Sequence, residues 1–167
     1  VDAIIICCSN LTALNKTIEY GWSKGIPTLS FTGFTTSPVS INTSVNYRLV
    51  GVYIGTWLAE LIGEKGNVIV MDGIPGYSAS DQQSDGMLAG LAMYPDITVV
   101  GHLAHNWTSQ VAQKELSTWM AAHPEEIHGI AVQSSGETGT LQALLQSGRD
   151  PIPPIALGGE LGALCYW

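Results

Sequence analysis

Charged side chains are scarce in this 167-residue chain, at 12% of its residues, and only six of them are Lys or Arg. With 14 acidic residues the formal net charge is −8. Such a field repels phosphate backbones and anionic lipid surfaces, so we expect no nucleic-acid partner. Hydrophobic residues reach 46%, which is typical of a folded protein rather than a disordered one.

Long hydrophobic runs are missing as well. The longest, such as 3–8 and 68–71, have the length of a strand and fall far short of the ~20 residues that a membrane-spanning helix needs. No leader precedes Val1, which already begins a strand-like run, and the chain stops on the apolar residues 165–167. We therefore expect a chain cut from a longer protein at both ends.

Cysteine is rare, and its spacing matches no metal site. Cys7 and Cys8 are neighbours, Cys165 is far away, and no CxxC pattern occurs. We expect three buried thiols, because free cysteine is among the most buried residue types. His102 and His105 lie at a strand end, where an HxxH pair lacks the helical register that aligns two ligands. No metal and no cofactor are expected.

Short apolar runs alternate with helix-like stretches at about 30 residues per repeat. This rhythm predicts an α/β fold, a Rossmann-like parallel sheet with helices on both faces. The expected strands are 3–8, 28–32, 67–72, 98–103, 129–133 and 154–158, and the expected helices are 11–24, 47–62, 80–93, 108–122 and 136–146.

One segment, 33–47, breaks the rhythm. It is polar, rich in Ser and Thr, and contains Pro38. It is long for a tight turn and short for a helical repeat, so we interpret it as a crossover between two lobes.

Ligands in such sheets bind beyond the carboxyl ends of the strands, so the loops that follow strands hold the candidate functional residues. Ser78 nearly completes a GxSxG pattern, but it lies too far past its strand for a nucleophile elbow, and a capping role is favoured. Trp107 follows a strand and offers a flat apolar face that suits a sugar ring. The alternative is that Trp107 covers the core at a loop.

Several segments together resemble the sugar-binding branch of type I periplasmic binding proteins. They are VDAIII at 1–6, GIP at 25–27, GNVIVMDGIPG at 66–76, SAS at 78–80, YPDI at 94–97 and Gln133. The resemblance implies two Rossmann-like lobes that hold the ligand between them, here a partial first lobe over 1–44 and a second lobe over 45–167. It also implies a periplasmic, monomeric receptor that delivers its small-molecule ligand to the permease of an ABC transporter.

The resemblance also implies which residues touch the ligand. The expected ligand-binding residues are Cys7, Thr32, Ser44, Ile74, Gln83, Trp107, Ser134 and Gly159. Ribose receptors have charged or amide side chains at several of these positions, and here neutral residues replace them, Thr32 and Gly33 standing for an Asp-Arg pair. Gln133 and the aromatic character of Trp107 are kept. We therefore expect a neutral or weakly polar ring rather than ribose as the ligand.

Two other functions are weighed against a transport receptor. The effector-binding core of a lactose-repressor-type regulator shares the fold, so the fold alone does not separate the two. An enzyme is disfavoured because no acid–base pair or nucleophile constellation is found.

Overall fold

The computed structural model describes residues 1–7, 10–149, 152, 154–156 and 159–165. The chain forms two compact units, Val1–Asn46 with Gly76–Ala79, and Tyr47–Pro75 with Ser80–Trp167. Among the described residues, no helix combines the length and the hydropathy that crossing a bilayer requires.

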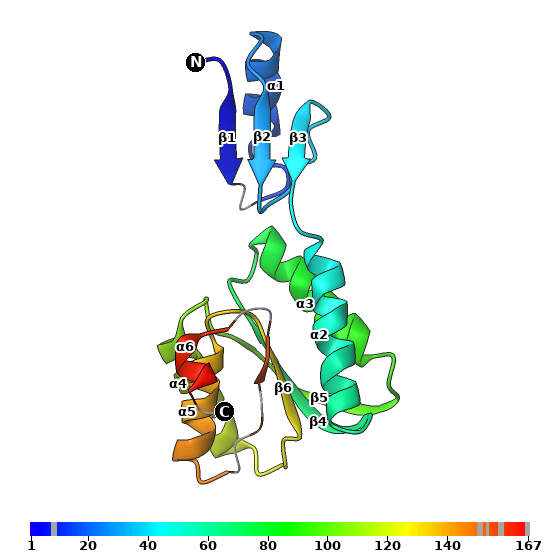
Figure 1. Ribbon diagram of the computed structural model, residues 1–167, viewed down its shortest axis with the longest axis vertical. Coiled ribbons are helices and arrows are strands. Elements are labelled where there is room, and N and C mark those ends of the chain that lie inside the picture. The colour runs from blue at the N-terminus through cyan, green and yellow to red at the C-terminus, as the bar shows by residue number, and fades with distance from the viewer. Residues whose placement is uncertain (8–9, 150–151, 153, 157–158, 166–167) are drawn as a thin grey trace. The chain divides into compact units, whose positions relative to one another are not determined.

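The first unit is a small parallel sheet with one helix (Figure 1). Its strands lie in the order β1-β2-β3, and Cys7 pairs with Phe31, which pairs with Thr43, so the three strands end level. The elements are β1 (Ile4–Cys7), α1 (Asn15–Ser23), β2 (Thr28–Phe31) and β3 (Ser40–Thr43).

Strand β3 was not expected, since the segment 33–47 was interpreted as an irregular crossover. Its sequence is polar and mostly exposed, so it carries no hydrophobic signal. Side-chain hydrogen bonds to the backbone fasten it instead. The Asn42 Oδ1 accepts from the Thr35 N–H at 3.0 Å, and the Asn42 Nδ2 donates to the Thr35 carbonyl at 3.0 Å.

The second unit is a parallel sheet in the order β5-β4-β6-β7 with helices on both faces (Figure 1). Alternate residues of β4 explain the two layers: Val68 and Val70 face α2 and α3, whereas Ile69 and Met71 face α4 and α5. The elements are α2 (Tyr47–Leu61), β4 (Lys65–Asp72), α3 (Ser78–Leu91), β5 (Asp96–Ala104), α4 (Ser109–Ala122), β6 (Gly129–Val132), α5 (Glu137–Gln146), β7 (Pro154–Ile155) and α6 (Leu161–Leu164).

Helices α2 and α3 touch through their backbones. Each carries two glycines four residues apart, Gly51 with Gly55 and Gly86 with Gly90. A Cβ at Gly51 would overlap the carbonyl oxygen of Gln83, and a Cβ at Gly86 would lie 2.9 Å from the Cα of Gly51. Glycine is required at this crossing for space, because any side chain would push the helices apart.

The predicted α/β class is confirmed, and six of the strands lie where they were expected, with ends that differ by up to three residues. The predicted burial of the cysteines is wrong for Cys7 and Cys165, which are both exposed. Cys7 ends an edge strand, and Cys165 directly follows the short helix α6, so neither position is enclosed. Cys8 lies outside the described residues.

Candidate functional site

Three expected ligand-binding residues meet at the carboxyl edge of the first unit's sheet. Cys7 is the last residue of β1, Thr32 follows β2, and Ser44 follows β3. The Cys7 Sγ lies 2.8 Å from the Thr32 Oγ1, and the Ser44 Oγ donates to the Thr32 carbonyl at 2.8 Å. The level ends of the strands thus gather a thiol and two hydroxyls into one neutral polar edge.

The thiol of Cys7 is tuned by its neighbour. Its hydrogen bond with the Thr32 hydroxyl lowers the pKa of Cys7, because a bond to the sulfur favours the thiolate form. Thr32 also has a φ of 63°, in the left-handed region, which costs a β-branched residue about 1–2 kcal/mol. The first unit therefore presents polar atoms from a strained turn at this edge.

Four more expected residues lie in loops at the carboxyl edge of the second unit's sheet. Ile74 follows β4, Trp107 follows β5, Ser134 follows β6 and Gly159 follows β7. The strand order β5-β4-β6-β7 places Trp107 and Ile74 on neighbouring strand ends, with Gly159 at the far side. Ile74 and Gly159 are exposed, while Trp107 and Ser134 are half-buried.

Two glutamine side chains near this edge are buried. Gln83 is buried on α3, and its Nε2 has no hydrogen-bond partner among the described residues. Gln133 is fully buried, and Ser80 holds its amide: the Ser80 Oγ donates to Oε1 at 2.9 Å, and Nε2 donates to the Ser80 carbonyl at 2.8 Å. Gln133 therefore lies buried beneath the loops of the second unit's carboxyl edge, and Ser80 fixes its orientation.

A polar cluster that was not expected joins β4, β5 and α3. The His102 Nε2 meets the Asp72 Oδ2, and the Ser84 Oγ lies 3.0 Å from that oxygen and 3.2 Å from the same Nε2. A catalytic Ser-His-Asp triad needs the hydroxyl and the carboxylate on opposite ring nitrogens. Here Ser84 and Asp72 both meet the Nε2 of His102, so the cluster lacks the arrangement in which His takes the serine proton while Asp orients the ring.

A β-bulge explains why the cluster escaped the sequence reasoning. The pairing of β4 with β5 shifts between Val68 and Ile69, so that His102 lies beside Val70. Residues two apart on a strand share a face, and His102 therefore comes to the face of Asp72. Regular alternation would have placed His102 on the opposite face.

Two titratable groups are buried under the carboxyl edge. His105 is fully buried, and burial lowers its pKa to about 4. Burial raises the pKa of Glu137, the first residue of α5. The Glu160 Oε2 accepts from the Thr138 N–H at 2.8 Å and so caps the same helix. Within the described part of the chain, no group of three or more His, Cys, Asp or Glu could hold a metal ion.

The turn that carries Trp107 is strained. Asn106 and Trp107 both have a φ of 52°, and Ser135 in the loop after β6 has a φ of 69°. Two consecutive left-handed residues other than glycine are costly, and such strain gathers at functional sites in proteins. The strain favours the interpretation that the turn fixes Trp107 in place to contact a ligand. The alternative is that Trp107 only covers the core.

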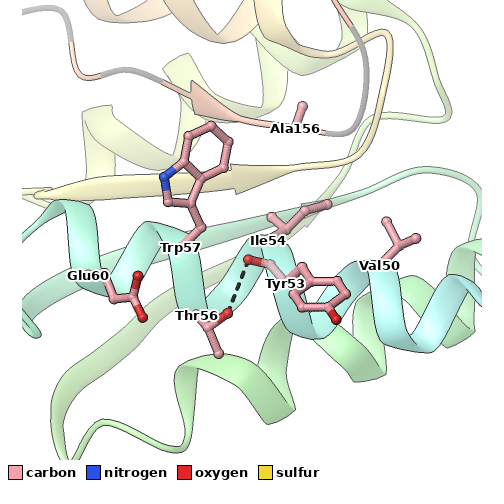
Figure 2. Close-up of a pocket in the computed structure, with 7 residues that line it drawn as sticks. All are labelled: Val50, Tyr53, Ile54, Thr56, Trp57, Glu60 and Ala156. Atoms are coloured by element: carbon pink, nitrogen blue, oxygen red, sulfur yellow. Dashed lines mark hydrogen bonds between the residues drawn. The ribbon is translucent and has the colours of Figure 1, made fainter.

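An apolar hollow lies elsewhere in the second unit, on α2. Figure 2 shows its lining, with Tyr53 and Trp57 on the helix and Ala156 beyond β7. Its volume is about 580 Å³, and Glu60 is its only charged lining residue among those described. The Thr56 Oγ1 lies 3.0 Å from the Val52 carbonyl oxygen and 3.2 Å from that of Tyr53, so its hydrogen is donated within α2. This lining suits hydrocarbon better than a sugar.

Known proteins are similar to this chain over nearly its whole length. A family model described as periplasmic binding protein domain matches residues 1–167. The xylitol-binding protein of Mycolicibacterium smegmatis is 29% identical over 161 residues, which cover 95% of this chain and 46% of that protein.

Two solved structures are similar over most of the chain. An ABC transporter periplasmic solute binding protein from Actinobacillus succinogenes with bound D-allose has a TM-score of 0.79 and 28% identity, covering 89% of this chain and 55% of that one. An ABC transporter solute binding protein from Agrobacterium vitis with bound α-D-tagatopyranose has a TM-score of 0.80 and 25% identity, covering 93% and 56%. The chain thus spans about half the length of the proteins it matches.

Proposed function

Because this chain belongs to the periplasmic binding protein family, we propose that its full-length protein is a periplasmic solute receptor that delivers a small sugar-like molecule to an ABC importer. The match over residues 1–167 is the observation that carries the proposal. The relatives are named as solute-binding proteins of xylitol, D-allose and D-tagatose, which favours a transport receptor over a lactose-repressor-type regulator.

The carboxyl edges of both sheets support a neutral, hydroxyl-bearing ligand. The first unit offers the Thr32 and Ser44 hydroxyls, and the second offers Ser134 and the indole of Trp107. Neutral hydrogen bonds contribute about 1 kcal/mol each and charged ones about 1.5–3 kcal/mol. We assign the ligand to polyols or sugar rings held by stacking and a few neutral bonds, with ribose disfavoured.

We propose the remaining assignments by analogy with the same family. Residues 1–44 are assigned to one lobe and residues 45–167 to the other, in a monomeric receptor whose protein partner is the transporter permease. The contact residues are Cys7, Thr32, Ser44, Ile74, Gln83, Trp107, Ser134 and Gly159. The receptor binds its ligand without transforming it, and it needs no cofactor.

A thermal-shift screen of the full-length protein tests the proposal. Xylitol, D-allose, D-tagatose and D-ribose are each added, and sucrose at the same concentration controls for non-specific stabilisation. A ligand at a hundred times its Kd adds about 2.7 kcal/mol of stability. We expect a shift with at least one polyol or sugar and a smaller one with ribose. No shift beyond that of sucrose with any of the four would contradict the proposal.

A further inference from the structure

The indole of Trp107 lies directly on the Cα of Gly73. A Cβ built at Gly73 would overlap both the Nε1 and the Cε2 of that ring. Gly73 is not among the glycines with a positive φ, so its backbone conformation does not call for glycine. The space taken by the indole is what excludes a side chain at residue 73.

The side chain of Gln133 also lies close to the Cβ position of Gly73. Its Oε1 lies 2.7 Å from the Cβ position of Gly73, and the two hydrogen bonds with Ser80 fix the orientation of the amide. The Gln133 Nε2 also points to the Asp72 Oδ1 at 3.5 Å. The seat of the indole is therefore bounded by a buried side chain that is itself held in place.

The turn that carries Trp107 is tied to Gly73 through the backbone as well. The Asn106 N–H donates to the Gly73 carbonyl at 3.0 Å, and the His105 N–H donates to the Asp72 carbonyl at 2.8 Å. These bonds continue the β4–β5 pairing beyond the strand ends. They hold Asn106 and Trp107, both in the left-handed region, next to Gly73. Gly73 therefore contacts both the backbone of this turn and the indole of Trp107.

From these contacts we infer that Gly73 is a positioning residue for sugar binding, because its missing Cβ is the seat that fixes the Trp107 indole at the carboxyl edge. This inference rests on the proposed function for its effect on affinity. A side chain at residue 73 displaces the indole and so weakens binding through Trp107.

The first test reads the indole directly, without any ligand. The chain has five Trp, and each gives one indole N–H signal in a ¹⁵N-correlation spectrum of the full-length protein. The signal lost in Trp107→Phe belongs to Trp107. We expect Gly73→Ala to move that signal and to leave the other four of the chain in place. A Trp107 signal unmoved by Gly73→Ala would overturn the inference.

A double-mutant cycle then measures the effect on affinity, with xylitol and D-allose as the titrated probes. Gly73→Ala should weaken binding about five- to tenfold in the wild-type background, and less than about twofold when Trp107 is already Ala. The control is Gly21→Ala on α1, where a Cβ would meet nothing nearer than the Ile26 carbonyl oxygen at 3.6 Å, and it should leave affinity unchanged.

The outcomes separate the two proposals. An equal loss from Gly73→Ala in both backgrounds would overturn the inference, since the effect would not pass through Trp107. Failure of the wild type to bind either probe counts against the proposed function, and the indole signal then still decides whether Gly73 seats the ring. If Gly73→Ala lowers the melting temperature, the double variant with Trp107→Ala should recover part of that loss, because the overlap with the indole is removed while the one with the Gln133 Oε1 remains.

Discussion

Trp107 is the proposed stacking platform at the carboxyl edge of the second unit. We predict that Trp107→Ala in the full-length protein weakens binding of its best ligand by about 1–3 kcal/mol, the range for stacking on an aromatic platform. That corresponds to roughly a 5- to 150-fold higher Kd by isothermal titration. Trp107→Phe, which keeps a flat ring, should lose less. An unchanged Kd in Trp107→Ala would show that Trp107 does not stack on the ligand.

Stability should depend on pH through His105. The pKa of His105 is 6.5 in a model peptide and about 4 in the folded protein, so the unfolded chain binds the extra proton between these values. The free energy of unfolding should therefore fall as the pH drops from 6.5 to 4, by up to about 3 kcal/mol from this residue. Urea unfolding of His105→Gln and of wild type at pH 7.0, 5.5 and 4.5 measures this slope, which should be shallower in the variant.

Glu137 supplies a control, because its effect on stability changes with pH in the opposite direction to that of His105. Burial raises its pKa, so the folded protein holds the proton more tightly than the unfolded chain does, and ionising Glu137 costs stability as the pH rises above 4.5. Glu137→Gln should therefore gain stability relative to wild type as the pH increases. If the free energy of unfolding fell more steeply with falling pH in His105→Gln than in wild type, a group other than His105 would be the main cause of the acid destabilisation.

At this scale the sequence could point to loop residues but not to buried networks. Trp107 was singled out because it follows a strand, which its neighbours in sequence reveal. The Asp72, His102 and Ser84 cluster depends on three separate elements and on a bulge in the β4–β5 pairing. Neither the register nor the bulge leaves a trace in hydrophobic periodicity, so this cluster was missed.

Among the elements, the crossing of α2 and α3 is sensitive to substitution. We predict that Gly51→Ala destabilises the protein by about 1–3 kcal/mol, the usual cost of overpacking, because its Cβ would overlap the Gln83 carbonyl and lie 2.8 Å from the Met87 nitrogen. Urea unfolding followed by circular dichroism measures the difference.

Gly21→Ala in α1 is the matched comparison. The helix has room at residue 21, so removing a glycine from its interior should stabilise the protein by about 0.5–1 kcal/mol. The two Gly→Ala changes are thus expected to have opposite signs. Destabilisation of equal size in both would mean that the α2–α3 contact is not the cause.

Hydrophobic patterning accounts for which elements were found. The buried strands β4 and β6 have apolar runs that only a core strand explains, and they were located correctly. β3 was missed because Ser40–Thr43 is polar and its place is set by pairing with β2 and by the Asn42 amide. The short helix α6 has too few residues for a periodic signal.

At the scale of the whole molecule, the matched relatives are about twice as long as this chain. We predict that a fragment of residues 1–167 binds the best ligand at least tenfold more weakly than the full-length protein, because in the proposed two-lobed receptor the other residues would supply part of the contacts. Titration of both proteins under the same conditions measures the ratio. Equal Kd values would mean that these 167 residues already hold the complete site.

The glycine contact between α2 and α3 has a mechanical consequence. Where two backbones are in contact, no side-chain rotamer can absorb a displacement, so we expect a movement of α2 to pass directly to α3. α3 carries Ser80 and Ser84, which grip Gln133 and Asp72 beneath the Trp107 turn. We therefore expect the residues under the indole to yield little, so that a ligand stacked on Trp107 would fit to their shape and the loops would supply the adaptation.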